Sequence, residues 1–253
     1  MRSLLICVLV LFSSCIQTPA PRIHALEIPH RVVDSSKKIP NKILTCPGKI
    51  SLEGESGGVV TGTVFPIYSK EINDKHYEVY FITARHVVDG VTPTKIEFYS
   101  IPEKNWEISS QVTLILGDVK TLFAHKTIDV ALVKAKSEVY IPLIDITVEH
   151  PKFMEEVVAV GCPFGEPLVV THGRVVRPSL YKGLWLITAP VVPGNSGGPI
   201  ISLRTGKVVG ITSRVYVINN GYSSSYVGHM HEMVPSYLFY DMIIDEIDKD
   251  LLK

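Results

Sequence analysis

The sequence predicts an all-β fold that ends in one α-helix. Of its 253 residues, 18 are Gly and 17 are Pro, a content that suits many short strands joined by turns. From Ile50 onward, short segments rich in β-branched and aromatic residues recur, with turn residues between most of them. No helical pattern separates these segments, and strands at this spacing are typical of sandwiches and barrels.

The predicted strands form two successive sets, and the final segment follows a different period. Apolar side chains recur there at helical spacing from Tyr237 to Leu251, directly after Pro235 and Ser236, which predicts a helix over about 236–250. The first set of strands comprises 59–65, 79–83, 95–99, 112–116 and 130–135, and the second comprises 157–161, 168–171, 174–176, 184–188, 199–202, 208–212 and 224–227.

The charge balance argues against a partner that is bound by net charge alone. Lys and Arg together number 25, and Asp and Glu together also number 25, in a chain that is 46% hydrophobic and 20% charged. A protein that binds nucleic acid or an anionic membrane by charge carries a basic excess, which is missing here. The sequence therefore predicts an ordered globular protein without a nucleic-acid partner.

Residues 1–20 predict an export signal, with an extracytoplasmic destination (periplasmic, cell-surface or secreted). Arg2 is followed by the apolar residues 4–12, whose helical rise of about 14 Å falls short of the roughly 30 Å hydrocarbon core of a bilayer. Small residues follow, as in a secretory signal. The segment Phe12–Cys15 also resembles the bacterial lipobox, so membrane attachment by a lipid on Cys15 and cleavage at a later small residue are the two alternatives.

The strongest chemical signal is the Gly-rich segment Pro193–Pro199 around Ser196. A turn of this kind holds a Ser side chain outward on a backbone that glycine lets approach other groups closely. The amides of Gly194 and Ser196 could then point at one spot and stabilise a developing oxyanion. Taken alone, the segment could also be a flexible turn.

A nucleophilic Ser needs a base and an acid that orients the base, and two further segments offer them. His86 ends a predicted strand, where a loop can aim its imidazole across a cleft. Asp129 precedes an apolar strand, a place suited to holding the imidazole in the tautomer that accepts the Ser proton. Asp118 is a rival acid, but it opens no sustained apolar strand, so we prefer Asp129. Taken singly, His86 could be a surface residue and Asp129 the cap of a turn.

His86, Asp129 and Ser196 occur in that chain order, each beside a strand segment. With these motifs the chain resembles the trypsin-like (chymotrypsin-fold) serine peptidases, and among them most of all the HtrA-type bacterial branch. The resemblance covers roughly residues 50–245. The segments that carry it are Thr83–Val88, Asp129–Leu132, Ala159–Gly165, Pro193–Pro199 and Val234–Ser236.

The resemblance implies a chymotrypsin-like fold of two six-stranded antiparallel β-barrels with a C-terminal α-helix. The peptidase domain would span 46–250, with the first barrel over about 46–145 and the second over about 150–235. Residues 21–45, which show no sustained period, would be an arm or a linker. The active site would lie in the crevice between the barrels.

The same resemblance assigns roles to single residues. His86 and Asp129 would come from the first barrel and Ser196 from the second, and the amides of Gly194 and Ser196 would form the oxyanion hole. Ser213 matches a family residue that supports the buried Asp and borders the substrate, unless it is an ordinary strand residue.

The sequence departs from the family pattern at two points, and the second bears on regulation. Val87 follows the His where animal digestive enzymes have Cys. The chain ends soon after its predicted helix, so we expect no peptide-binding PDZ domain of the HtrA type and no regulation by one.

The specificity pocket is expected to be uncharged. In trypsin-like enzymes an acid six residues before the nucleophile selects Lys or Arg, and Pro190 stands at that position here. A buried Lys would be left without a counter-charge, whereas an aliphatic group would gain from burial. His229 and His231 occupy the strand that forms a wall of the pocket in the family, and either could favour Glu or Gln unless it faces solvent. We expect cleavage after Val, Ala or Leu, with Glu or Gln as the second choice.

Cys46 and Cys162 are the cysteines outside the signal region. In an exported protein, such a pair could form a bridge that joins the arm to the second barrel. The alternative is that both are small buried hydrophobic residues.

The sequence as a whole predicts a secreted or surface-tethered serine endopeptidase that hydrolyses polypeptides through an acyl-enzyme intermediate, without a metal or other cofactor. A protein that keeps the peptidase fold but serves as a binding module is the alternative. The intact set of His86, Asp129 and Ser196 argues against it, because a binding module has no reason to retain all three.

Overall fold

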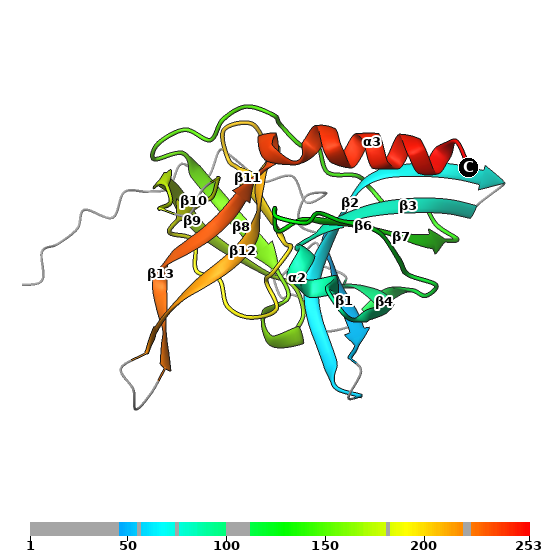
Figure 1. The fold of residues 1–253 in the computed structure, drawn as a ribbon, viewed down its shortest axis with the longest axis horizontal. Coiled ribbons are helices and arrows are strands. Elements are labelled where there is room, and N and C mark those ends of the chain that lie inside the picture. Colours follow the sequence, from blue (N-terminus) through cyan, green and yellow to red (C-terminus); the bar gives the residue numbers. More distant parts are fainter. Residues whose placement is uncertain (1–45, 55–56, 74–75, 100–111, 181–182, 220–223) are drawn as a thin grey trace, which may run out of the picture. The chain divides into compact units, whose positions relative to one another are not determined.

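The computed structural model describes residues 46–54, 57–73, 76–99, 112–180, 183–219 and 224–253. The predicted export signal, the lipid on Cys15 and the arm over 21–45 lie outside these residues. The described part consists mainly of strands, with one longer helix at the end (Figure 1). None of its helices has the length and apolar character needed to cross a membrane.

The first half of the described chain folds into a seven-stranded antiparallel sheet. Its strand order is β5-β4-β1-β2-β3-β7-β6, and the apolar side chains of its inner face form one buried cluster. The strands are β1 (Gly48–Glu53), β2 (Val59–Asn73), β3 (His76–Thr83), β4 (Thr92–Tyr99), β5 (Val112–Leu116), β6 (Lys120–Ala124) and β7 (Ala131–Ser137).

This sheet is not the closed six-stranded barrel that the resemblance implied. β5 and β6 lie at its two edges, although only residues 117–119 separate them in sequence. That short connection keeps the two edges near each other, so the sheet curls into a half-barrel. A closed barrel needs a hydrogen-bonded ladder at every seam. Among the described residues no such ladder joins β5 to β6, so the expectation of a closed first barrel was wrong.

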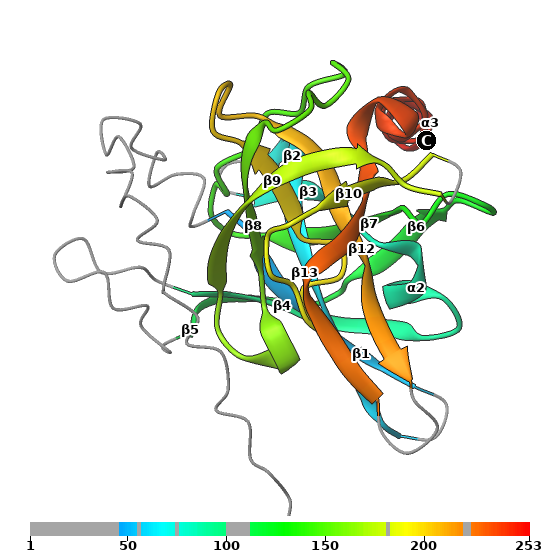
Figure 2. The same ribbon diagram turned by 90° about the vertical axis from the view of Figure 1, so that its left-hand side faces the viewer.

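The second half of the described chain forms a closed six-stranded barrel, which confirms the prediction for this region (Figure 2). The order around the barrel is β10-β13-β12-β11-β8-β9, with a separate buried cluster inside it. The strands are β8 (Glu156–Gly161), β9 (Val169–Pro178), β10 (Trp185–Ile187), β11 (Pro199–Ser202), β12 (Val208–Asn219) and β13 (Ser224–Pro235).

β9 shows how glycine can continue a strand instead of ending it. The segments 168–171 and 174–176, predicted as two strands, belong to one strand that includes Gly173. A Cβ added to Gly173 would lie 2.0 Å from the main-chain nitrogen of Ala189. Glycine therefore lets β9 pass close to another segment of the barrel.

The chain ends in helix α3 (Tyr240–Leu251), which confirms the predicted C-terminal helix, although it begins at Tyr240 rather than at 236. α3 runs along β2 and β3 (Figure 1). Near its end, Asp250 accepts hydrogen bonds from the Tyr80 hydroxyl at 3.0 Å and from Lys134 Nζ at 2.6 Å, which fixes the helix to the first sheet. The shorter helical segments are α2 (Arg85–Val88), η1 (Pro163–Gly165) and η2 (Ser236–Leu238).

Cys46 and Cys162 are thiols in the structure, so the bridge considered from the sequence is not formed. Both side chains are fully buried in one hydrophobic cluster. Burial raises the pKa of the Cys162 thiol to about 12. The two cysteines therefore behave as small core residues, which was the alternative interpretation.

Candidate active site

His86 lies on α2, the short helix that follows β3. Its neighbours Val87 and Val88 are buried in the core of the first sheet, whereas 45% of the His86 side chain is exposed. The buried pair anchors the helix, so the imidazole projects outward from a fixed element.

Asp129 lies just before β7 and contacts His86 at two atoms. Its Oδ2 is 2.8 Å from His86 Nδ1, and its Oδ1 accepts the main-chain N–H of His86 at 3.0 Å. The Ser213 hydroxyl, on β12 of the barrel, donates to Oδ2 at 2.7 Å. Burial alone would raise the pKa of Asp129, but the hydrogen bond and charge of His86, together with Ser213, hold that pKa below its usual value. An ionised carboxylate only accepts, so Nδ1 of His86 carries a proton and Nε2 of a neutral imidazole is left as the acceptor.

Asp118, the rival acid, lies away from this contact. It occupies the exposed turn between β5 and β6, with Lys120 Nζ at 3.4 Å and Lys136 Nζ at 3.9 Å. The structure therefore pairs Asp129 with His86, as the sequence analysis preferred.

Ser196 lies in the loop before β11, which we call the Ser196 loop (residues 193–198). The N–H of Asn195 donates to the carbonyl of Val192 at 3.1 Å, which closes a turn with Pro193 and Gly194 at its centre. Pro suits the second position of a type II turn, and a positive φ is required at the third, where Gly194 has φ 96°. The sequence order Pro-Gly thus determines the shape of the chain just before Ser196.

Two close approaches bring this loop beside α2. A Cβ added to Gly197 would lie 2.5 Å from the main-chain nitrogen of Ala84. A Cβ added to Gly62 would lie 2.6 Å from Val87 Cγ1 and 3.3 Å from the carbonyl oxygen of Ser196. No side chain fits at either position, so the Ser196 loop packs closely against the segment just before α2, and Gly62 of β2 lies between Val87 of α2 and the Ser196 carbonyl.

The peptide groups around Ser196 are held through their carbonyl oxygens. The C=O and N–H of a trans peptide point in opposite directions, so the bonds to the Pro193 and Asn195 carbonyls aim the N–H groups of Gly194 and Ser196, which belong to the same peptides, away from those carbonyl partners. Among the described residues, neither of these two N–H groups has an acceptor. The carbonyl oxygens and their donors are Pro193 with Phe164 N (2.7 Å), Gly194 with Thr63 Oγ1 (2.8 Å), Asn195 with Gly198 N (2.9 Å) and Ser196 with Thr63 N (2.9 Å).

Thr63 of β2 contributes contacts that the sequence analysis did not anticipate. It is fully buried, and it binds both the Gly194 and the Ser196 carbonyl groups. Gly194 is 131 positions away in the chain, and no motif around Thr63 signals that contact.

The three residues expected at the substrate pocket lie in different surroundings. Ser213 contacts Asp129, at an irregularity in the pairing of β12. Pro190 is exposed, and its carbonyl accepts the Thr171 hydroxyl at 2.7 Å. His229 is exposed on β13. Within the described residues, no hydrogen bond joins Pro190, Ser213 and His229 to one another.

His231, the other histidine of β13, is fully buried. It lies opposite Ile187 of β10 and Val215 of β12, and directly opposite residues share a face of the sheet. Neither ring nitrogen makes a hydrogen bond of regular geometry among the described residues. Burial lowers the pKa of His231 more than the nearby backbone of Gly228 raises it, so a neutral imidazole stands inside the barrel wall at pH 7.

The site offers a Ser hydroxyl, an imidazole of fixed tautomer and two N–H groups that have no acceptor among the described residues, although no hydrogen bond joins Ser196 to His86 in this part of the chain. These are the groups that acyl transfer uses for attack, proton transfer and stabilisation of an oxyanion. In the part of the chain that the structure describes, no three His, Cys, Asp or Glu side chains gather where they could hold a metal ion.

Comparisons with a family model and with curated proteins point to the same family. The family model of the trypsin-like peptidase domain matches residues 60–211. The probable periplasmic serine endoprotease DegP-like of Halomonas elongata is 30% identical over 149 residues, which cover 56% of this chain and 28% of that protein. The serine protease DegP homolog of Plasmodium falciparum is 34% identical over 119 residues, which cover 42% of this chain and 13% of that protein. The chain thus matches less than a third of the length of these relatives.

Solved structures share the fold at low sequence identity. The serine endoprotease from Yersinia pestis matches with a TM-score of 0.58 at 18% identity, over 82% of this chain and 66% of that one. The HtrA-type protease AlgW with tripeptide matches with a TM-score of 0.61 at 17% identity, over 84% of this chain and 64% of that one. Because the family model matches more than half of the sequence, the chain belongs to the trypsin-like peptidase domain family, with DegP-type proteins among its relatives.

Proposed function

We propose that the protein is a serine endopeptidase in which Ser196 is the nucleophile, His86 the general base and Asp129 the acid that orients it. One observation carries the proposal: the Ser196 loop packs against Ala84, two residues before His86 of the hydrogen-bonded His86–Asp129 pair, and the loop's two N–H groups have no acceptor among the described residues. The names of the DegP and HtrA relatives support the same activity.

The proposed reaction proceeds in two stages. Ser196 Oγ attacks the scissile carbonyl carbon while His86 Nε2 takes the hydroxyl proton, and the N–H groups of Gly194 and Ser196 stabilise the oxyanion. The imidazolium gives its proton to the leaving amine as the C–N bond breaks, which leaves an acyl-enzyme. Water then attacks the ester, with His86 again as base, and releases the acid product and free Ser196.

Asp129 acts through His86 and does not touch the substrate. Its carboxylate holds the proton on Nδ1 and stabilises the imidazolium formed during each stage. The Ser213 hydroxyl donates a hydrogen bond to Oδ2 of the same carboxylate. This bond restricts the rotation of the Asp129 side chain and keeps Oδ2 against the imidazole.

For specificity, we infer a preference for an aliphatic residue before the cleaved bond. Pro190 carries no charge, and its neighbours Ala189 and Val191 are buried in the apolar cluster of the barrel. Lys or Arg would find no counter-charge from these residues. The buried, neutral imidazole of His231 supports Gln or Glu as the second choice, since it can donate a hydrogen bond to either side chain.

The proposed setting is extracytoplasmic, with polypeptides as substrates. The apolar stretch of residues 4–12 has the length of a secretory signal, and the Halomonas relative is named periplasmic. A lipid on Cys15 would tether the protein to a membrane surface. Mass spectrometry of the mature N-terminus separates a lipid on Cys15 from simple cleavage.

Labelling with a fluorophosphonate probe tests the function without requiring a known substrate. Ser196 Oγ forms a bond to phosphorus, fluoride leaves and His86 takes the hydroxyl proton. We expect the wild type to be labelled at Ser196 and the folded Ser196→Ala variant to remain unlabelled. A folded wild type that is not labelled would instead support a binding module with the peptidase fold.

A further inference from the structure

We propose that Thr63 is a positioning residue that orients the Ser196 loop through its side-chain hydroxyl. The inference rests on the proposed function, because its consequence is the alignment of the oxyanion-binding N–H groups. Thr63 does not touch the reacting atoms; it acts on the backbone that carries them.

Thr63 contacts the two residues that supply those N–H groups. Its hydroxyl donates to the Gly194 carbonyl at 2.8 Å, and its main-chain N–H donates to the Ser196 carbonyl at 2.9 Å. The remaining two carbonyls of the turn, those of Pro193 and Asn195, bond within the second half of the chain. The N–H groups of Gly194 and Ser196 belong to those two peptides, and Thr63 binds the peptide that follows each of them, Gly194–Asn195 and Ser196–Gly197. Among the described contacts, Thr63 therefore ties the backbone next to both N–H groups to the first sheet.

Thr63 is itself held in place on every side. Its Oγ1 accepts the main-chain N–H of Cys162 at 3.0 Å, and its carbonyl accepts the Thr83 hydroxyl at 2.8 Å. It also lies within β2, where it is paired with Lys49 of β1. The hydroxyl thus has a single orientation: its oxygen accepts the main-chain N–H of Cys162, so its proton is donated to the Gly194 carbonyl.

The position of this hydroxyl links the two halves of the catalytic machinery. Thr83, which binds the Thr63 carbonyl, lies just before the helix that carries His86. Thr63 in turn binds the loop that carries Ser196. A single buried residue therefore sets the distance between the base from the first sheet and the nucleophile from the barrel.

Two substitutions separate the hydroxyl from the rest of the residue. Thr63→Val keeps the shape and the main-chain N–H but removes the donor to Gly194 and the acceptor for Cys162. Thr63→Ser keeps the hydroxyl and removes the methyl group. Ser202→Ala is a matched control, because Ser202 is also fully buried and its hydroxyl donates to Glu155 at 2.6 Å, outside the proposed machinery.

The measurement is the rate of fluorophosphonate labelling as a function of probe concentration, which separates the maximal rate from the half-saturating concentration. We expect Thr63→Val to lower the maximal rate about 10-fold, less than the 10²- to 10³-fold loss of an oxyanion donor itself. The half-saturating concentration and the shape of the pH dependence should stay unchanged, because neither probe binding nor His86 is altered. Thr63→Ser should label within about 2-fold of the wild type, since the hydroxyl is retained.

Thermal melting of each variant separates positioning from general destabilisation. Ser202→Ala should melt at a lower temperature yet label at the wild-type rate. Normal labelling of Thr63→Val, or an equal loss of rate in Ser202→Ala, would overturn the inference while leaving the proposed function intact. Failure of the wild type to label would remove the proposed function instead. Should Thr63→Val fail to fold, Thr63→Ala replaces it with the same expected loss of maximal rate.

Discussion

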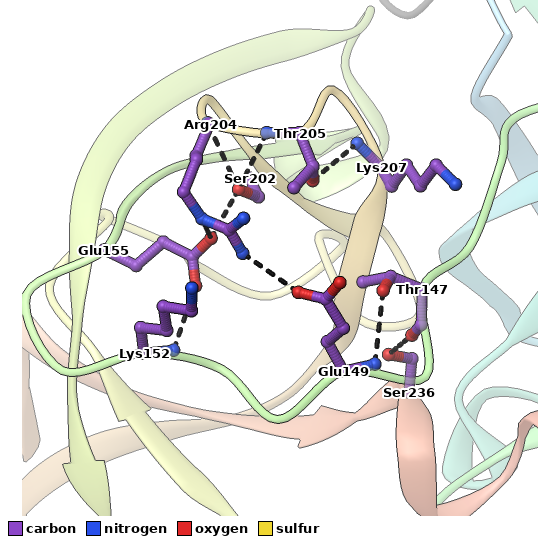
Figure 3. Close-up of polar contacts among 9 residues, drawn as sticks. All are labelled: Thr147, Glu149, Lys152, Glu155, Ser202, Arg204, Thr205, Lys207 and Ser236. Atoms are coloured by element: carbon purple, nitrogen blue, oxygen red, sulfur yellow. Dashed lines mark hydrogen bonds and ion pairs between the residues drawn. The ribbon is translucent and has the colours of Figure 1, made fainter.

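Thr63 and Ser202 are both fully buried hydroxyl residues, but they lie in different regions of the molecule. Ser202 belongs to what we call the Glu155 cluster, formed by Lys152, Glu155, Ser202 and Arg204 (Figure 3). Glu155 accepts the Ser202 hydroxyl at 2.6 Å, Arg204 Nε at 3.2 Å and the Lys152 N–H at 2.9 Å. These bonds join the segment before β8 to the turn after β11.

The difference between the two regions lies in the partners of the hydroxyl groups. In the Glu155 cluster, the Ser202 hydroxyl and both oxygens of the Glu155 carboxylate hold one segment of the barrel to another. Around the Ser196 loop, the carbonyl groups are bonded, while the N–H groups of Gly194 and Ser196 have no acceptor among the described residues. A buried polar network therefore supports stability when all its donors are paired, and supports chemistry when selected donors stay unpaired.

The largest expected effect is on the nucleophile and the base. Ser196→Ala and His86→Ala should each reduce peptide hydrolysis by about 10⁶-fold, because the attacking hydroxyl group or its proton acceptor is lost. Both variants should melt within a few degrees of the wild type, since neither side chain is part of the buried core. Wild-type hydrolysis by a folded Ser196→Ala protein would exclude the proposed mechanism.

Asp129→Asn should have the next largest effect, a loss of about 10⁴-fold in the maximal rate of hydrolysis. An amide NH₂ facing Nδ1 favours the tautomer with the proton on Nε2, so His86 no longer accepts the Ser196 proton. The measurement is steady-state hydrolysis of a peptide substrate by purified protein. A loss smaller than about 10-fold would mean that Asp129 does not control the tautomer.

The specificity of cleavage is expected to differ by about 10²-fold between residue classes, the size of effect that a pocket's polarity can produce. Digestion of a denatured protein and sequencing of the products should show cuts after Val, Ala or Leu, with Gln or Glu next. In a His231→Leu variant, cuts after Gln and Glu should decrease relative to the aliphatic sites. Predominant cleavage after Lys and Arg in the wild type would contradict the interpretation of Pro190.

Glu155→Gln should destabilise the fold by about 1–3 kcal/mol and leave activity unchanged. The amide has the same shape, but one of its donors faces a group that already donates, and the ion pair with Arg204 is lost. Urea unfolding measures the loss, and fluorophosphonate labelling provides the control. A marked fall in the labelling rate would show that the Glu155 cluster and the Ser196 loop are coupled.

The smallest expected effect is a change of stability with pH at Asp129. Its folded-state pKa lies below the usual 3.8, so the stabilisation it provides is fully present above the unfolded value and is lost as the pH falls through the folded value. The difference in unfolding free energy between wild type and Asp129→Asn should be constant between about pH 5 and 7, and should shrink below 3.8. If this difference in unfolding free energy grew on acidification, the folded-state pKa of Asp129 would lie above its unfolded value, which would contradict the account.

The sequence could predict features that depend on local patterns. The Pro-Gly turn before Ser196, the strand into which Asp129 leads and the helical period after Pro235 each involve neighbouring residues, and the structure has these local features. The pairing of His86 with Asp129 also followed from motif order and family resemblance. These signals are short-range or chemical, so they remain visible in a single chain.

Features that depend on distant contacts could not be read in this way. β1 and β6 were missed because their short segments gain stability mainly from the neighbouring strands. The open seam between β5 and β6 depends on pairing across the whole sheet. The role of Thr63 depends on a carbonyl 131 residues away, and an isolated buried Thr gives no signal of it.

A crystal structure of the phosphonylated protein tests the central claim most directly. The account predicts a bond from Ser196 Oγ to phosphorus, with a phosphoryl oxygen at about 2.7–3.1 Å from the main-chain nitrogens of both Gly194 and Ser196. The Thr63 hydroxyl should still donate to the Gly194 carbonyl. A phosphoryl oxygen directed into solvent, or a Gly194 peptide whose N–H binds a protein acceptor instead, would contradict the account.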